Sequence, residues 1–195
     1  MAPVRNTIEN GKGQIQTHVT QRVNSLRAEY NALRETIARL QSQASKLESQ
    51  SRSKSRRYFT NVAEINTRLQ SGTTPGNPQL VASLDQARSA LGRLSSTLAA
   101  MNKLSVSISD TASRASVLMD DTRSAYNISG AVEADHRALQ NLEDNIQSVL
   151  ITIDRVQNTV SDHTTRTRSY IESENKNIRT LSLAVANGDF YGPSQ

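Results

Sequence analysis

The stretch VTQRVNSLRAEYNALRETIARLQSQASKL, residues 19–47, decides the fold. Its apolar side chains recur in alternating steps of four and three residues. Positions spaced in this way lie along one stripe of an α-helix, which is the pattern of coiled-coil packing. The stretch therefore predicts a long helix that buries one face against other helices. The members of the stripe are Val19, Val23, Leu26, Tyr30, Leu33, Ile37, Leu40, Ala44 and Leu47.

The same spacing continues beyond this stretch and is interrupted twice. SGTTPGNP at 71–78 holds two Gly and two Pro, and NISGA at 127–131 holds one Gly. Proline lacks an amide donor and disfavours helix in the residue before it, so the first helix must stop at the first break. The pattern predicts helices over about 15–71, 78–127 and 131–186.

Short connections make consecutive helices antiparallel neighbours. We therefore expect an all-α fold, an elongated antiparallel three-helix bundle with coiled-coil-like heptad packing. The rod should span residues 21–186, after a protruding N-terminal segment over 1–20 that could itself be helical and before a flexible C-terminal tail over 187–195. A hydrophobic content of 35% with 4% aromatics suits a narrow buried seam better than a compact globule.

The seam of the first helix falters near its middle. After Leu47 its register lands on Ser51 and Lys54, and the apolar positions resume with Tyr58 after an extra step of four residues. Counting outward from the turns places Lys54 opposite 94–98 of the second helix and level with 163–167 of the third. We expect a polar or loosely packed layer there, with the Lys54 side chain extending outward to solvent.

A run of cations occupies this same region. SQSRSKSRRYF, residues 49–59, contains Arg52, Lys54, Arg56 and Arg57 and no acid. Residues 1–70 hold 12 Lys and Arg against 5 Asp and Glu, whereas residues 71–195 hold 11 against 13. The run is either a solvated helix face or a binding site for an anionic partner. The intervening serines could be phosphorylated, which would cancel part of that charge.

The C-terminal stretch NGDFYGPSQ, residues 187–195, differs in composition from the rod. It joins Phe190 to Tyr191 between two glycines, after the expected end of the last helix. Aromatic side chains on a short tail suit docking into a groove of a partner. The alternative is that the pair folds back and covers the end of the bundle.

Motifs for catalysis or cofactor binding are weak. The chain has no Cys and three His. EADH, residues 133–136, matches one Glu-x-x-His pair, but di-metal bundles need two such pairs and further acids. Asp120 and Asp121 are adjacent on a helix and point in different directions. We therefore expect no metal, no cofactor and no enzymatic activity.

These patterns favour a non-enzymatic structural or scaffolding protein that acts through helix–helix self-association or through assembly with partners. The expected partners are further copies of the chain, as a homo-oligomer or filament, or other helical proteins. The alternative is a peripheral binder of anionic surfaces through the basic first helix. A membrane is then favoured over nucleic acid, because only Tyr58 and Phe59 lie near enough to stack on bases. Lacking the apolar core of a signal peptide near residue 1, the chain is expected to be cytoplasmic or membrane-peripheral.

Overall fold

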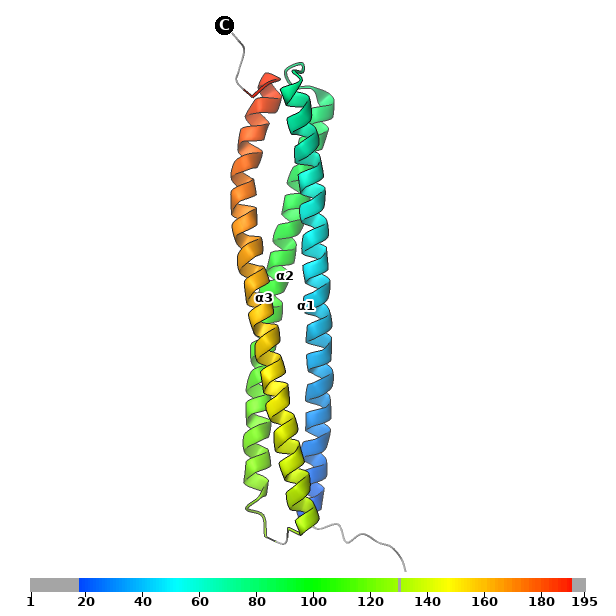
Figure 1. The fold of residues 1–195 in the computed structure, drawn as a ribbon, viewed down its shortest axis with the longest axis vertical. Coiled ribbons are helices and arrows are strands. Elements are labelled where there is room, and N and C mark those ends of the chain that lie inside the picture. The colour runs from blue at the N-terminus through cyan, green and yellow to red at the C-terminus, as the bar shows by residue number, and fades with distance from the viewer. Residues whose placement is uncertain (1–17, 130, 191–195) are drawn as a thin grey trace, which may run out of the picture.

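The computed structural model describes residues 18–129 and 131–190. Three α-helices make up nearly all of this part: α1 over His18–Gln70, α2 over Pro78–Ala125 and α3 over Glu133–Asn187. They lie side by side, up, down and up, as one rod (Figure 1). At about 1.5 Å per residue the longest helix extends for about 80 Å. The predicted all-α antiparallel three-helix bundle is confirmed, and the described residues form no strand.

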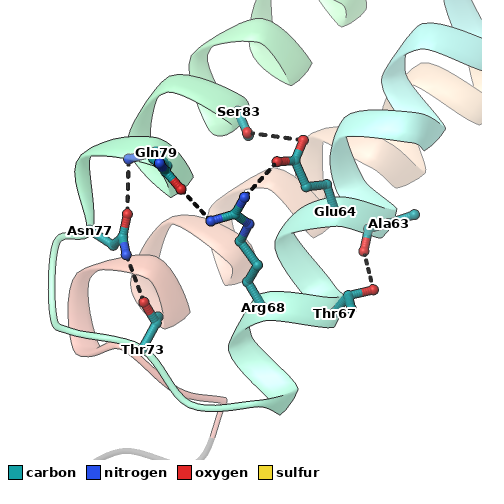
Figure 2. A network of polar contacts seen from close by, with 8 residues as sticks. All are labelled: Ala63, Glu64, Thr67, Arg68, Thr73, Asn77, Gln79 and Ser83. Atoms are coloured by element: carbon teal, nitrogen blue, oxygen red, sulfur yellow. Dashed lines mark hydrogen bonds and ion pairs between the residues drawn. The ribbon is translucent and has the colours of Figure 1, made fainter.

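The turn between α1 and α2 is fixed by its own side chains. Asn77 caps α2 because its Oδ1 accepts a hydrogen bond from the Gln79 backbone amide at 2.9 Å, while its Nδ2 donates to Thr73 Oγ1 at 2.9 Å. Pro78 follows as the first residue of the helix, where its missing amide proton costs nothing. Arg68 of α1 reaches across to the Gln79 side chain (Figure 2) and so joins the two helices beside the turn.

The end of α3 is bound to this same turn. Gly188 caps α3 in the left-handed conformation, with φ of 83°, and its amide donates to Ala184 O at 2.9 Å. The Thr73 amide donates to Gly188 O at 3.2 Å, and the Gly76 amide donates to Val185 O at 3.0 Å. The first two residues of the expected tail over 187–195 thus belong to the rod: Asn187 ends α3, and Gly188 is buried at its cap.

The other end of the rod joins all three helices. The expected boundary at residue 20 lies inside α1, because Val19 is fully buried and Thr20 Oγ1 donates to Asp135 Oδ1 of α3 at 3.0 Å. Asp135 also accepts from the Val132 amide at 3.3 Å and so closes the first turn of α3. The remainder of the predicted protruding segment, residues 1–17, lies outside the described residues.

The core consists of two apolar clusters, one in each half of the rod. The half next to the 126–132 turn holds the cluster of 19–40, 104–125 and 139–160, and the half next to the 71–77 turn holds the cluster of 58–69, 80–94 and 171–185. The resumed register after the basic run is confirmed, since Tyr58, Ile65 and Leu69 are buried. In the sequence, the apolar spacing of the third segment starts at Val132, but this residue is exposed, because it precedes the first turn of α3.

A second buried row on α2 was not predicted. Besides the expected stripe, α2 buries a residue at every seventh position, because it packs more extensively on α1 and α3 than those two pack on each other. Several members of this row are small or polar, so hydropathy alone does not reveal them. The row consists of Ser83, Ala90, Thr97, Leu104, Thr111, Leu118 and Ala125.

The predicted polar layer lies between the two clusters. Ser51 Oγ of α1 lies 3.4 Å from Thr167 Oγ1 of α3, and Thr97 and Thr164 are buried near the same level. The Thr164 hydroxyl has no hydrogen-bond partner among the described residues. The helices therefore pass through the middle of the rod without a shared apolar core, and the basic run of α1 is placed at this point.

Candidate functional site

The four predicted cations of α1 point in more than one direction. Arg52, Arg56 and Arg57 are exposed. Lys54 is half-buried, and its Nζ donates to the buried Thr97 Oγ1 of α2. The expectation that Lys54 extends outward is therefore wrong: its long stem crosses the α1–α2 interface, where the threonine hydroxyl replaces a water as partner of the ammonium group.

Most cations of the run lack an anionic partner. Arg52 pairs with Glu48 one turn earlier on α1. Glu48 is itself close to α3, with its Oε1 3.3 Å from His163 Nε2. Arg56 and Arg57 form no ion pair with any described residue, so their positive charges remain available to a ligand.

The side of α1 that faces α3 carries a basic groove, which we call the α1–α3 basic groove. Its volume is about 550 Å³. No carboxylate of the described residues lines it, and α3 adds Arg166, which forms no ion pair with any described residue, to the cations of α1. The lining residues are Ser51, Arg52, Ser55, Arg56, Phe59, His163, Arg166, Thr167 and Tyr170.

The side of α1 that faces α2 carries a second basic hollow of about 450 Å³. Lys54 and Arg57 of α1 meet Arg93 of α2 there, between glutamine, asparagine and serine side chains. This hollow also lacks a carboxylate among the described residues that line it. The basic run therefore supplies cations to a hollow on each side of α1, and a neighbouring helix adds one arginine to each hollow.

Aromatic side chains border the α1–α3 basic groove. The rings of Phe59 and Tyr170 have centroids 5.6 Å apart, and Phe59 is 54% exposed. Tyr58 lies beneath them, fully buried, and its hydroxyl donates to Glu174 Oε2 at 2.7 Å. Burial raises the pKa of Tyr58, and the adjacent Glu174 carboxylate raises it further. Phe59 is thus the apolar surface that a ligand in this groove would meet.

Other sequence candidates are placed elsewhere. Phe190 is 38% exposed just after the cap of α3, and Tyr191 lies outside the described residues, so the proposed docking tail stays a prediction. Glu133 pairs with Arg137, and the His136 ring stacks on Tyr126. Asp121 pairs with Arg22 at 3.0 Å. Within 18–129 and 131–190, no three His, Asp or Glu side chains gather as a metal site requires.

The charge of the rod differs between its halves. In the half next to the 71–77 turn, the helical residues 41–70, 78–103 and 161–187 hold 13 Lys and Arg against 6 Asp and Glu, a net +7. In the other half, residues 18–40, 104–125 and 133–160 hold 8 against 10, a net −2. The α1–α3 basic groove and the second basic hollow lie in the positive half, near its boundary with the negative half.

Comparison with known proteins gives no relative, since no protein-family model, curated protein or solved structure matches the chain. None of the helices within the described residues has the length and apolar content needed to cross a membrane. The sequence had indicated Arg52, Lys54, Arg56 and Arg57 as a candidate site. It had not indicated Arg93 or Arg166, because their place beside the run depends on how the helices align. Counting from the turns could have found both.

Proposed function

We propose that this protein is a non-enzymatic structural or scaffolding rod that assembles with anionic partners at its basic half. The observation that supports this proposal is the meeting of Arg56 of α1 and Arg166 of α3 around one groove, neither of them paired with an acid of the described residues. Neighbouring like charges repel, so holding them together without counter-charges costs free energy that an anionic partner would recover. If the basic run were only a solvated face of α1, there would be no reason for a cation of α3 to lie beside it.

The second candidate is peripheral binding to an anionic membrane surface. It is favoured by the exposure of Arg52, Arg56 and Arg57 on α1, with Arg93 and Arg166 on either side. Such a cluster would attract acidic lipid headgroups, by about 1 kcal/mol for each cation near the surface. Nucleic acid is less favoured, because Phe59 is the one exposed aromatic side chain in the basic grooves of the described residues.

The test compares the chain with a variant in which Arg52, Lys54, Arg56 and Arg57 are all replaced by Gln. Cosedimentation with acidic vesicles and light scattering of the protein alone are measured at low and high salt. We expect self-association or vesicle binding that weakens with salt and that the variant loses, while circular dichroism shows unchanged helix content. A chain that stays monomeric and binds neither acidic vesicles nor acidic peptides would overturn the proposal.

The control removes the same charge from the other half of the rod. Arg27, Arg34, Arg39 and Arg114 are exposed there and form no ion pair with a described residue. Replacing these four by Gln should leave assembly nearly unchanged. If both variants lose binding to the same extent, net charge rather than the basic grooves is responsible.

A further inference from the structure

The α1–α3 basic groove does not end at the basic run. A cavity of about 190 Å³ adjoins it along the same two helices, and His163 lines both. Met101 and Leu104 of α2 are buried at this cavity, and Leu47 and Val156 are half-buried beside it. Together the two hollows extend along 41–59 of α1 and 155–170 of α3, about 25 Å at the rise of a helix.

Positive charge follows both edges of this longer groove. Arg52 and Arg56 lie on the α1 edge, and Arg155 and Arg166 lie on the α3 edge. Arg155, like Arg56 and Arg166, forms no ion pair with any described residue. Glu48 is the one carboxylate of the described residues that lines the groove, and Arg52 and His163 already contact it. The groove thus has an apolar interior between two cationic rims.

We infer that this groove binds an amphipathic α-helix of a partner protein, with a leucine-rich stripe flanked by Asp and Glu on both sides. The inference rests on the proposed function and names its partner. An apolar helix face fits a groove between two parallel-running helices, and acids on its flanks would meet the two rims. The fourth helix completes a four-helix bundle where α1 and α3 pack least extensively.

A flat anionic surface fits the groove less well. Its headgroups would reach the exposed arginines on the rims and would leave Leu47, Val156 and the aromatic Phe59 unused or only partly covered. It would also engage Arg57 and Arg93 on the other side of α1 as readily as Arg56 and Arg166. This difference between the two sides of α1 separates a helical partner from a membrane.

The test uses a labelled synthetic helix of about 18 residues, enough for about 25 Å, with a leucine stripe and glutamates on both flanks. Fluorescence anisotropy compares the full chain with two double variants, Arg56→Glu with Arg166→Glu and Arg57→Glu with Arg93→Glu. We expect the first to weaken binding by about tenfold or more and the matched control by less than about threefold. The same peptide with Lys for Glu, and a scrambled peptide of equal composition, should not bind.

A second variant tests the apolar half of the groove. Ala44→Trp places a large side chain at the mouth of the 190 Å³ cavity and should weaken peptide binding by about tenfold without changing any charge. Circular dichroism and thermal melting verify that each variant is folded. If Ala44→Trp does not fold, the test uses Val156→Trp on the opposite wall of the cavity instead.

Several outcomes would overturn the inference. Equal weakening by the two double variants indicates a general anionic surface, such as a membrane. If the parent chain does not bind the peptide but self-associates, and Arg56→Glu with Arg166→Glu abolishes this self-association, the groove is occupied by a second copy of the chain. If the peptide fails while salt-sensitive assembly or vesicle binding persists, the helical partner is wrong and the proposed function stands. If the chain shows no peptide binding, no salt-sensitive assembly and no vesicle binding, both the inference and the proposed function are wrong.

Discussion

At the scale of single residues, two glycines on this rod should respond oppositely to the same substitution. Gly188 has φ of 83°, and an added Cβ would lie 2.5 Å from Thr73 O. Gly188→Ala should therefore lower the free energy of unfolding by about 2 kcal/mol or more. Gly92 lies inside α2 with no neighbour within 4 Å of an added Cβ. Gly92→Ala should raise the free energy of unfolding by about 0.5 to 1 kcal/mol.

Urea unfolding followed by circular dichroism measures both changes. Because Gly188 joins α3 to the 71–77 turn by backbone hydrogen bonds, its substitution should also increase amide exchange at Thr73 and Gly76. A Gly188→Ala variant as stable as the parent chain would show that α3 is not held to the turn in this way.

Tyr170 should make the stability of the rod sensitive to alkali. Its hydroxyl is buried with no hydrogen-bond partner among the described residues, and burial raises its pKa above the ordinary 10.0, with the Glu174 carboxylate adding to the shift. Tyr170 is neutral in both states below pH 10, whereas above pH 10 only the unfolded chain ionises freely. Stability is thus fully present below pH 10 and falls as pH rises above it.

The variant Tyr170→Phe tests this point. It removes an unpaired buried hydroxyl, so it should be more stable than the parent at pH 7, by about 1 kcal/mol. It should also lose less stability between pH 9 and 11, since one ionising phenol is gone; Tyr58, whose pKa burial also raises, retains its part of the effect. Thermal melts across this pH range give both quantities, and parallel curves for the two chains would contradict the assignment.

At the scale of the helices, periodicity predicted what lies inside but not how wide the buried face is. In the stripe predicted from residue 19, six members are buried and three are half-buried, namely Tyr30, Ala44 and Leu47. The second row on α2 escaped because Ser83, Thr97 and Thr111 are not apolar, and their burial follows from contact with helices on two sides. The basic groove and the basic hollow were predicted only in part, because each is formed by side chains of two helices, whereas periodicity describes one helix at a time.

The two apolar clusters predict a local response to a charge in the seam. Leu142 of α3 and Leu40 of α1 are buried in the cluster next to the 126–132 turn. Leu142→Asp or Leu40→Asp should lower the free energy of unfolding by about 3 kcal/mol or more, because a carboxylate replaces a buried side chain. Hydrogen exchange should show the loss of protection first in that half, since the polar layer separates the clusters.

The exposed Gln140→Asp on α3 is the control for this change. It adds the same charge one turn or less from Leu142 without entering the core, so it should alter stability by less than about 0.5 kcal/mol. Equal loss of protection near Ile65 and Leu91, in the other cluster, would mean that the rod opens as one unit.

At the scale of the whole molecule, the fold followed from the sequence and the site did only in part. Three long stripes and two breaks admit one simple arrangement, which the structure has. The meeting of Arg166 with Arg56, and the continuation of their groove into an apolar cavity, depend on the axial alignment of α1 and α3. Counting from the two turns placed the basic run level with 163–167, but it did not show which side chains of α3 lie on the face toward α1.

The shape of the rod is the last quantity that can be tested. A rod of about 80 Å has a radius of gyration of about 24 Å, whereas a compact globule of the same chain length has about 16 Å. Small-angle X-ray scattering separates these values, and light scattering gives the mass, 21.4 kDa for one chain. A single-chain mass with the larger radius means that the seams pair within the chain. Twice that mass at unchanged length would mean that helices pair between chains, and a radius near 16 Å would contradict the rod itself.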